Sequence, residues 1–361
     1  MPGIENWWLM RRIRVLEVIT GLGAGGAERL LLDMMRHFNT DKFDVRVVSI
    51  TGDLNGLKVF GQQDHKIEVF DLKTGSRVSS YMKMRAYVKN FAPDVIHAHM
   101  FHSLLVSLGM RKFLFKKPAI CFTSHRSNYS IPRTFLVRLL RKLRDADVVF
   151  TEGQHPKQNC NRIEIIPNGV HVSAECPSRK MWNPAGRIRL LAVGRLIELK
   201  NPLGILQSMA DINLPGLTID FLGTGPLEIE ARNYASQLGI ADRAKFHGVR
   251  SDVGECMKRA DVFVMQSRNE GMPMALLEAG AEAMPVVATP VGSIPSLLGE
   301  DRGWMAVPEA FAVTLRAVIE NPTFALAAGR RLHAHVLNNN SISKTVLDHE
   351  RLYSSLAAII K

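Results

Sequence analysis

The sequence predicts an α/β protein built from two doubly wound, parallel-sheet domains. Short apolar runs alternate with helical patterns along the first half of the chain, which is typical of parallel strands joined by helices. A polar stretch that contains prolines interrupts this pattern near Val172–Gly186, and the alternation then starts again. The length of 361 residues also favours two domains, because single domains cluster near about 100–150 residues.

The individual strands are read from their apolar runs. In the first half these runs predict strands at Ile13–Thr20, Val45–Ile50, Val95–Ala98, Ile120–Thr123 and Asp147–Thr151. In the second half they predict strands at Arg189–Val193, Leu217–Leu222, Ala244–Gly248, Val262–Met265 and Val286–Ala288. Two helices stand out, one from about Ala27 to Phe38 after a glycine loop and one over Ser341–Ile360.

These elements divide the chain into four parts. We expect an N-terminal Rossmann-like domain over residues 1–170, a linker over 171–187 and a C-terminal Rossmann-like domain over 188–340. A helix over 341–361 should pack back toward the N-terminal domain. Ligands of open parallel sheets bind at the carboxyl ends of the strands, so we expect the site there, in a cleft between the domains.

Composition excludes several classes of protein. The four cysteines show no paired or metal-type spacing, which predicts reduced thiols and no zinc site. No apolar run reaches the roughly 18–20 residues of a spanning helix, and the N-terminus lacks the apolar region of a signal peptide. We therefore expect a cytoplasmic protein.

The formal charge of +12 is concentrated in one segment. Residues 111–144 hold ten lysines and arginines and no acidic residue. Such a block suits anionic lipid headgroups or a phosphorylated acceptor; nucleic acid is least favoured, because no recognition motif accompanies the charge. Within it, Arg133–Arg144 places leucines at helical spacing. This helix either packs on the core with a solvated basic face or lies on a membrane surface on the inner face of the cytoplasmic membrane.

A glycine-rich loop, Gly21–Gly26, follows the first predicted strand and precedes a helix. It satisfies the dinucleotide-binding fingerprint, which would indicate a nicotinamide enzyme. The acidic residue expected at the end of the second strand is missing there, since Asp53 lies further out. Three interpretations therefore stay open: a cofactor loop, an acceptor or phosphate loop in which Gly23, Gly25 and Gly26 approach a ligand, and a tight structural turn.

The most informative motif is Asn269-Glu270-Gly271-Met272-Pro273-Met274, which follows the predicted strand Val262–Met265. Pro273 predicts a helix start, with the proline in the first turn. Glu270 then lies on the loop and Glu278 in the early helix, while the amides of Gly271, Met272 and Met274 offer donors at a positive dipole end. Two carboxylates around such a site suit sugar or ribose hydroxyls better than phosphate.

Other motifs follow the neighbouring strands. Arg195 and Lys200 come after the first strand of the second half, before a helix start at Asn201-Pro202, and two cations there neutralise a diphosphate without a metal. Gly223 and Gly225 end the next strand, and Gly248-Val249-Arg250 ends another, where a base would lie against the backbone.

Histidines mark strand ends in the first half. His125 follows the strand Ile120–Thr123, while His97 and His99 flank another strand end and point the same way in the period-2 pattern. A lone histidine is usually structural, and at most one of His97 and His99 needs to contact a ligand.

Taken together, these motifs resemble those of family 4 retaining glycosyltransferases, in the same order along essentially the whole chain. The resemblance rests on Arg195 with Lys200, Gly223-x-Gly225-Pro226, the Gly248 turn and Glu270-x7-Glu278. It rests also on Gly25-Gly26-Ala27-Glu28, on Pro93–His99 and on Ile166-Pro167-Asn168-Gly169-Val170. The Glu-x7-Glu motif with Gly-Met-Pro is specific.

The resemblance implies a GT-B fold, with two Rossmann-like domains facing across a cleft. It implies that Glu270 contacts the transferred sugar, Glu278 the ribose, and Arg195 and Lys200 the leaving diphosphate. Gly223, Gly225, Val249, Arg250, Gly271, Met272, Pro273 and Met274 would complete the donor site. His125 matches the family's active-site histidine, and His99 would lie on the acceptor side.

The expected activity is transfer of a sugar, with retention and without a metal or cofactor, from a nucleoside diphosphate-sugar, with UDP-sugar favoured. The expected acceptor is a hydroxyl of a glycan that is lipid-linked, in bacterial cell-surface polysaccharide biosynthesis. The alternatives are a GT-B-fold nucleotide-sugar epimerase, an NAD-dependent oxidoreductase that uses Gly21–Gly26, and a non-catalytic binding subunit. Two segments depart from the family pattern: Thr151–Gln154 with the short stretch to Asn161, and the leading Met1–Arg11.

Overall fold

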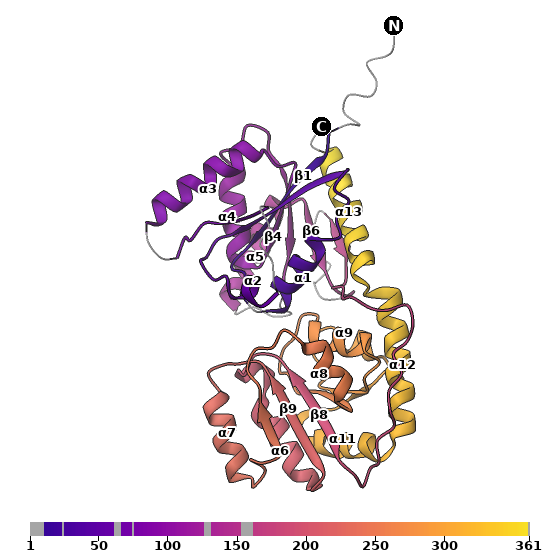
Figure 1. The fold of residues 1–361 in the computed structure, drawn as a ribbon. Helices are drawn as coiled ribbons and strands as arrows, with labels where there is room; N and C mark the ends of the chain where they lie inside the picture. The colour runs from indigo at the N-terminus through magenta and orange to yellow at the C-terminus, as the bar shows by residue number, and fades with distance from the viewer. Residues whose placement is uncertain are drawn as a thin grey trace. The chain divides into compact units, whose positions relative to one another are not determined.

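The computed structural model describes residues 11–23, 25–60, 66–73, 76–125, 131–152 and 162–359 (Figure 1). The chain forms two compact units. The first unit consists of Met1–Pro167 with Ser343–Lys361, and the second of Asn168–Ile342. Both departures from the family pattern noted above fall largely outside the described residues. Within the described part of the chain, no helix has the length and apolar character needed to cross a bilayer.

The first unit contains a parallel seven-stranded sheet in the order β3-β2-β1-β4-β5-β6-β7. Its strands are β1 Ile13–Ile19, β2 Phe43–Ser49, β3 Ile67–Val69, β4 Val95–His99, β5 Ala119–Thr123, β6 Ala146–Val149 and β7 Ile163–Ile165. The two edge strands, β3 and β7, have only three residues each, too few to show a periodic pattern in the sequence. The order reverses between β1 and β4, which is where open α/β sheets bind ligands.

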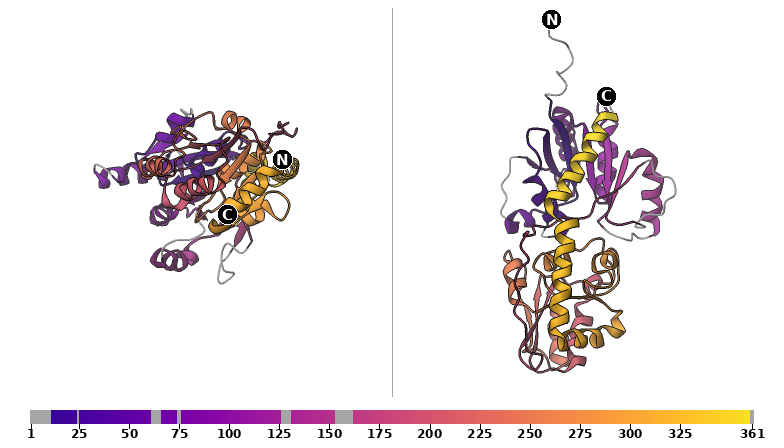
Figure 2. Two further views of the ribbon diagram at one scale, coloured as in Figure 1. Left: turned by 90° about the horizontal axis from the view of Figure 1, so that it is seen from below. Right: turned by 90° about the vertical axis from the view of Figure 1, so that its right-hand side faces the viewer.

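Helices cover both faces of this sheet. They are α1 Gly26–Met35, α2 Asn55–Phe60, α3 Arg77–Phe91, α4 Phe101–Arg111, α5 Ile131–Leu139, a 3-10 turn Leu140–Leu143 and α13 Ile342–Ile359. Leu16 and Val18 of β1 belong to the core under α3 and α4, while Ile19 belongs to the core under α1. Helix α13, drawn in yellow, runs along the sheet, so the C-terminal helix belongs to the first unit (Figures 1 and 2).

The second unit contains a parallel six-stranded sheet in the order β10-β9-β8-β11-β12-β13. Its strands are β8 Ile188–Val193, β9 Leu217–Leu222, β10 Ala244–Phe246, β11 Val262–Met265, β12 Val286–Ala288 and β13 Trp304–Met305. Its helices are α6 Pro202–Ile212, α7 Glu228–Gln237, α8 Val253–Arg259, α9 Met274–Ala281, α10 Ile294–Leu298, α11 Phe311–Glu320 and α12 Pro322–Asn339, with 3-10 turns Glu198–Lys200 and Pro308–Ala310. The predicted fold class, two doubly wound parallel sheets, is confirmed.

The segment expected to be a linker, 171–187, packs on the second unit. Trp182 is buried in the core of that unit, and its Nε1 donates to the carbonyl of Ile319 at 2.9 Å. The Arg179 guanidinium donates to the carbonyls of Glu282 and Met257, each at 3.1 Å. An indole and a guanidinium can therefore hold an irregular segment in place where the sequence shows only prolines and polar residues.

The basic segment differs in two ways from the first of the two alternatives, a core-packed helix. The helix expected over Arg133–Arg144 ends at Leu139 and continues as a 3-10 turn, and Leu139 and Leu143 are exposed rather than directed into the core. Arg144 is buried, where its guanidinium pairs with Asp147 at 2.7 Å and lies over the ring of Phe122. Some of the positive charge is therefore structural. Arg126 lies outside the described residues.

Candidate active site

The loops that follow β8 and β11 meet at the point where the strand order of the second sheet reverses. β8 and β11 are neighbours, with β9 beyond one and β12 beyond the other. Loop residues at the carboxyl ends of these two strands therefore lie at the same edge of the sheet, where open α/β sheets bind ligands. These loops carry Arg195 and Lys200 on one side and Glu270 to Met274 on the other.

Lys200 and Glu270 form an ion pair that joins these two loops. Lys200 Nζ lies 2.5 Å from Glu270 Oε1, and the Glu270 side chain is largely buried while Lys200 is partly exposed. Asn201, the next residue, has a left-handed backbone with φ 50°, and its amide donates to Gln266 Oε1 at 3.0 Å. This contact joins the end of the β8 loop to the start of the β11 loop. Pro202 begins α6 as predicted, although Asn201 makes no capping hydrogen bond with its side chain.

Two glycines let the β9 loop pack against the β8 loop. Gly223 has φ +133°, and a Cβ there would lie 2.1 Å from the Gly194 carbonyl oxygen. A Cβ on Gly225 would lie 2.2 Å from the Leu196 carbonyl oxygen. The amide of Leu196 in turn donates to the Thr224 carbonyl at 2.9 Å. Only glycine permits this contact, which holds the backbone on either side of Arg195.

The helix after the motif begins one residue later than predicted. Pro273 occupies the N-cap position of α9 with an extended backbone, so the expectation that it lies in the first turn is wrong. Its carbonyl accepts from the amides of Leu276 and Leu277, which is the bonding expected of an N-cap residue. Glu278 lies in the second turn of α9 and is partly exposed. Met274 is the first residue of the helix, so its amide lies at the positive end of the helix dipole, as the sequence predicted.

Asn168 and Asn340 hold this loop from behind, a role that the sequence did not assign to them. The Asn168 amide donates to the Met272 carbonyl at 3.0 Å, and its backbone N–H contacts Met272 Sδ at 3.1 Å. The Asn340 amide donates to the Asn168 carbonyl at 2.9 Å. Both asparagines are buried. Asn168 belongs to the Ile-Pro-Asn-Gly-Val motif, which was the available signal.

Gly292 is a second residue that the sequence did not single out. It has φ +60°, and a Cβ there would lie 2.1 Å from the Glu270 carbonyl oxygen and 2.9 Å from that of Gly271. The next residue, Ser293, donates its amide to the Gly271 carbonyl at 3.0 Å. The turn after β12 therefore supports the loop that presents Glu270.

The remaining predicted donor residues lie on the exposed side of these loops. Arg195 is exposed, and so are Val249 and Arg250 after β10. The Arg250 guanidinium donates to both carboxylate oxygens of Asp252, at 2.7 and 2.6 Å. That carboxylate raises the pKa of Arg250 above its ordinary value.

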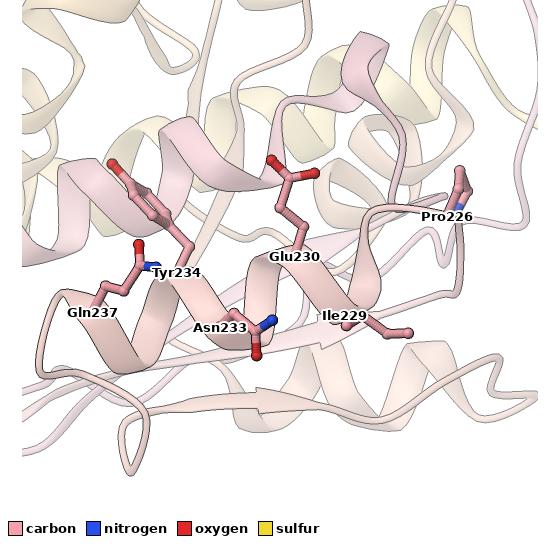
Figure 3. Close-up of a pocket in the computed structure, with 6 residues that line it drawn as sticks. All are labelled: Pro226, Ile229, Glu230, Asn233, Tyr234 and Gln237. Carbon is pink, nitrogen blue, oxygen red and sulfur yellow. The ribbon is translucent and has the colours of Figure 1, made fainter.

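An open hollow of about 490 Å³ lies along α7, lined by Pro226, Ile229, Glu230, Asn233, Tyr234 and Gln237 (Figure 3). None of the predicted donor residues lines it. The Tyr234 hydroxyl in it donates to Gln207 of α6. All six lining residues lie on α7 or just before it, and none of them belongs to the β8 or β11 loop.

In the first unit, the glycine loop packs against the turn after β2. A Cβ on Gly56 would lie 2.3 Å from the Gly23 carbonyl oxygen, and one on Gly23 would lie 2.9 Å from Asp53 Oδ2. Gly25 is the N-cap of α1 and Gly26 its first residue. Asp53 therefore reaches the loop from beyond the strand end, while β2 itself ends at Ser49 with no acid.

A buried polar cluster lies on the face of the first sheet that α13 covers. Glu17 of β1 and His97 of β4 are directly opposite in register, and His99 points the same way, as predicted. His99 Nε2 lies 2.7 Å from Glu17 Oε2, and the Tyr353 hydroxyl of α13 donates to Glu17 Oε1 at 2.6 Å. His125 Nε2 lies 3.0 Å from His99 Nδ1. The structure therefore brings together His97, His99 and His125.

Burial and hydrogen bonding set the charge state of this cluster. Burial raises the pKa of Glu17, but His97 and His99 outweigh it and hold the pKa well below its ordinary value. Burial lowers the pKa of His97 and of His99, despite the nearby carboxylate. Burial and the His99 and His97 rings bring the pKa of His125 well below its ordinary value. Glu17 is therefore an anion at neutral pH and the three histidines are neutral.

Glu17 and Tyr353 were missed in the sequence. The signal for Glu17 was a carboxylate inside the apolar run of the first strand, at a position that becomes fully buried. Glu17, His97 and His99 also place three potential metal-ligand atoms within 4.8 Å of one another, although no zinc site was expected from the cysteines.

Comparison with known proteins places these two units in a family. The model for Glycosyltransferase Family 4 matches residues 24–174. The model for Glycosyl transferases group 1 matches residues 178–334. This range contains both the β8 loop, with Arg195 and Lys200, and the Glu270–Glu278 motif. The chain belongs to glycosyltransferase family 4. This family 4 protein is a glycosyltransferase with the GT-B fold. Family membership argues against the interpretation of Gly21–Gly26 as a nicotinamide site.

Individual relatives of this glycosyltransferase agree with the family assignment. The amylovoran biosynthesis glycosyltransferase AmsD of Erwinia amylovora is 24% identical over 305 residues, covering 81% of this chain and 85% of AmsD. A UDP-Gal:alpha-D-GlcNAc-diphosphoundecaprenol alpha-1,3-galactosyltransferase of Escherichia coli is 32% identical over 141 residues, covering 36% of each protein. The crystal structure of Anabaena Alr3699/HepE in complex with UDP-glucose has a TM-score of 0.81 at 17% identity, covering 95% of this chain and 100% of that one.

Proposed function

We propose that this glycosyltransferase transfers a sugar, with retention and without a metal ion, from a nucleoside diphosphate-sugar to a hydroxyl of a lipid-linked glycan. The pathway we propose is bacterial cell-surface polysaccharide biosynthesis. The observation that carries the proposal is the Lys200–Glu270 ion pair at the switch point of the second sheet. It puts one cation and one carboxylate side by side where a bound donor would present a diphosphate and a sugar.

In this proposal the donor exchanges partners with the ion pair. The diphosphate takes Lys200 as its counterion, and the Glu270 carboxylate then accepts hydrogen bonds from the sugar hydroxyls. The largely buried Glu270 stays close to its cation, which limits the cost of keeping a carboxylate out of water. Negative charge grows on the diphosphate as the glycosidic bond breaks, so Lys200 and the exposed Arg195 stabilise the transition state more than the bound donor.

Lys200 and Arg195 therefore supply the charge that a divalent cation would supply in a metal-dependent transferase. Glu278, in the second turn of α9, is assigned to the ribose, and the amides at the start of α9 to the donor's polar groups. Retention rests on the family resemblance of the Glu270–Glu278 motif.

The relatives support the choice of donor and acceptor. HepE structures contain UDP and UDP-glucose, and the galactosyltransferase relative is named for a UDP-linked sugar and a diphosphoundecaprenol-linked acceptor. AmsD is named for amylovoran biosynthesis. We therefore favour a UDP-sugar as the donor and a polyprenol-linked glycan as the acceptor.

A surface near residues 111–144 would bring the enzyme to that acceptor on the inner face of the cytoplasmic membrane. Five large apolar side chains are exposed there: Phe113, Phe115, Phe135, Leu139 and Leu143. The Arg111 guanidinium donates to the Leu143 carbonyl at 3.1 Å, which joins the two ends of the segment. Exposed aromatic and leucine side chains among lysines and arginines suit the interface of an anionic bilayer.

A donor panel tests the transferase proposal. The purified protein is offered UDP-, GDP-, ADP- and dTDP-sugars, and NAD, with and without a bacterial lipid extract and with and without EDTA. We expect a UDP-sugar to raise the melting temperature and to release UDP only when the extract is present, with EDTA having no effect. A melting shift with NAD alone would overturn the proposal. Loss of release in EDTA would overturn metal independence, and an inverted anomer in the product would overturn retention.

Vesicle binding tests the membrane surface separately. We expect the protein to sediment with vesicles that contain anionic lipid and to stay in solution with neutral ones. Phe115→Ser with Phe135→Ser should abolish sedimentation, whereas Phe324→Ser, which alters an exposed phenylalanine of the second unit, should not. Equal sedimentation of both variants would contradict this surface.

A further inference from the structure

With Glu17 ionised and its histidines neutral, the contacts of the buried cluster in the first unit are compatible with one arrangement of protons. Glu17 is an anion, so both of its oxygens accept hydrogen bonds. The Tyr353 hydroxyl donates to Glu17 Oε1 at 2.6 Å. Burial and the nearby Glu17 carboxylate raise the pKa of Tyr353 well above its ordinary value, so this hydroxyl keeps its proton. Because a hydroxyl has one proton, the Tyr353 oxygen must accept from its second neighbour.

That second neighbour is His97. His97 Nδ1 lies 2.6 Å from the Tyr353 oxygen, so Nδ1 carries the proton. A neutral ring then has an acceptor at Nε2, and Thr123 Oγ1 lies 2.7 Å from it and donates. The Tyr353 hydroxyl, both ring nitrogens of His97 and the Thr123 hydroxyl are therefore each assigned as a donor or an acceptor.

The other side of Glu17 leads to His125. His99 Nε2 lies 2.7 Å from Glu17 Oε2, which can only accept, so His99 carries its proton on Nε2. Because His99 is neutral, its Nδ1 is an acceptor, and the ring nitrogen 3.0 Å away, His125 Nε2, must be the donor. His125 is neutral as well, so its Nδ1 has no proton.

We propose that Glu17 and His99 act as positioning residues that hold His125 as the Nε2–H tautomer and present its Nδ1 as a hydrogen-bond acceptor. His99 transmits the constraint, since a carboxylate on one side of an imidazole decides which nitrogen faces the other side. Tyr353 completes the arrangement, because its hydroxyl donates to the second oxygen of Glu17, Oε1. His97 supports it by donating from Nδ1 to the Tyr353 oxygen, and this Nδ1 also lies 3.3 Å from Glu17 Oε2.

This inference rests on the proposed function for its consequence. His125 then accepts a hydrogen bond from a hydroxyl of the sugar or acceptor through Nδ1. It does not act as an imidazolium, because burial and the neighbouring rings oppose protonation. His99, which we expected to contact the acceptor side directly, acts instead through His125.

A metal ion bound by Glu17, His97 and His99 is the competing interpretation of the same atoms. A cation would need the lone pairs that now face protons. In particular, it would displace the proton that His99 Nε2 donates to Glu17 at 2.7 Å and the contact between His97 Nδ1 and Tyr353 at 2.6 Å. The hydrogen-bond network uses these atoms completely, which favours protons over a metal.

Nitrogen NMR of the full-length chain labelled with ¹⁵N-histidine tests the tautomer directly. Two-bond correlations from the ring carbons' protons distinguish Nε2–H from Nδ1–H imidazole, and His125→Gln assigns the signals. We expect wild-type His125 to be the neutral Nε2–H form at pH 7, unchanged by added ZnCl₂. An Nδ1–H form, an imidazolium, or a shift of the His99 signals on adding Zn²⁺ would overturn the proposal.

Three variants distinguish the positioning of His125 by Glu17 and His99 from a general loss of structure. Glu17→Gln keeps the volume and removes the charge, and His99→Phe keeps a ring and removes both nitrogens. Both should convert His125 to a mixture of tautomers. Thr123→Val, the matched control, changes a partner of His97 only and should leave the His125 signals as in wild type. If His125 remains purely in the Nε2–H form in both Glu17→Gln and His99→Phe, the proposal is overturned. If Glu17→Gln does not fold, the His125 tautomer in His99→Phe alone tests the proposal.

The activity arm distinguishes this inference from the proposed function. With the UDP-sugar found in the donor panel, Glu17→Gln and His99→Phe should lower kcat by about tenfold or more while KM for the donor changes less than about twofold. If kcat is unchanged in both variants although His125 has become a mixture of tautomers, the positioning role is overturned. An inactive wild type with the expected tautomer would instead contradict the proposed function and leave the proton arrangement established.

Discussion

The side-chain amide of Asn168 donates to the backbone carbonyl of Met272 at 3.0 Å. The two residues are more than a hundred positions apart in the sequence, and both are buried within the second unit. This hydrogen bond holds the loop between Glu270 and the start of α9, so the geometry of the proposed donor site depends on a residue outside that site.

We first predict that Asn168→Ala weakens donor binding without removing any group assigned to the donor. The Met272 carbonyl loses its buried donor, which costs about 1–3 kcal/mol of stability. Thermal unfolding and calorimetric titration with the donor measure the two effects. Asn233→Ala, an exposed asparagine on α7, is the control and should alter neither. If Asn168→Ala binds the donor with wild-type affinity, the loop between Glu270 and α9 keeps its shape without this hydrogen bond.

Lys200→Ala should lower kcat more than it weakens donor binding. The cation acts on charge that grows as the diphosphate leaves, so its loss raises the barrier, and we expect a fall of about 10²–10³-fold in kcat. Lys258→Ala, which removes an exposed lysine paired with Glu255, should behave as wild type. Steady-state rates and the donor Kd are compared for both. Equal losses in kcat and in binding would contradict a role in the transition state.

Glu278→Ala should act on the donor Kd instead. A carboxylate that accepts from ribose hydroxyls binds the donor and the transition state equally, so we expect about tenfold weaker binding of UDP and of the UDP-sugar alike. Calorimetric titration with UDP measures this effect. Glu282→Ala, one turn later on the chain, serves as the control. Wild-type affinity for UDP in Glu278→Ala would remove Glu278 from the ribose site.

Gly292→Ala should destabilise the protein and disable the site together. Both Gly292 and Gly239 have left-handed backbones, with φ +60° and +68°, so alanine is strained at either position, by about 1 kcal/mol. Only at Gly292 would the new Cβ meet the Glu270 carbonyl oxygen, at 2.1 Å, whereas nothing lies within 4 Å at Gly239. Denaturant unfolding and turnover should therefore separate the two variants. If Gly292→Ala and Gly239→Ala have similar stability and turnover, the Glu270 loop moves to accept the new Cβ without loss of activity.

The first unit should lose stability as the pH falls from 7 to 5. The groups that face one another in its buried cluster are Glu17, His97, His99, Cys121, His125, His349 and Tyr353. The pKa values of His97, His99, His125 and His349 lie below the ordinary 6.5, so below that pH the unfolded chain binds more protons than the folded one. The lowered pKa of Glu17 acts in the same direction below about pH 4.5.

Melting temperatures measured across this pH range check the sign. His99→Phe should show a shallower fall between pH 7 and 5 than wild type, because one depressed group is missing. His37→Gln, which alters an exposed histidine, should keep the wild-type slope. A melting temperature that is constant or rises on acidification would contradict the assignment of neutral buried histidines.

Much of the fold could be predicted from the sequence because its determinants are local. The runs Val262–Met265 and Val286–Ala288 coincide with strands, since a strand buried on both faces is apolar throughout. Leu217–Leu222 also coincides with a strand, and its two polar residues, Thr218 and Asp220, are only partly buried. The motifs around Lys200 and Glu270 could be placed at strand ends for the same reason, and parallel strands bring those ends to one edge. Their pairing at 2.5 Å follows from β8 and β11 being neighbours.

Other features depended on contacts between distant parts of the chain. Whether a leucine at helical spacing is buried depends on what packs against it, and Leu139 and Leu143 proved to be exposed. Gly292 and Tyr353 are ordinary residues in their local sequence, and they matter because of a loop and a carboxylate far away along the chain. Asn168 belongs to a recognisable motif, but its partner, the Met272 carbonyl, is visible only in the fold.

By itself, then, the sequence determined the two parallel sheets, the family and the residues at the strand ends, because periodicity and short motifs are local properties. Only the tertiary structure decided which groups share protons and which loops support one another. Glu17 shows the difference. In the sequence it is one acid in an apolar strand, whereas in the fold it accepts from Tyr353 at 2.6 Å across 336 positions and, through His99, sets the proton of His125. Burial removes water as an alternative partner, so each of these groups depends on the others.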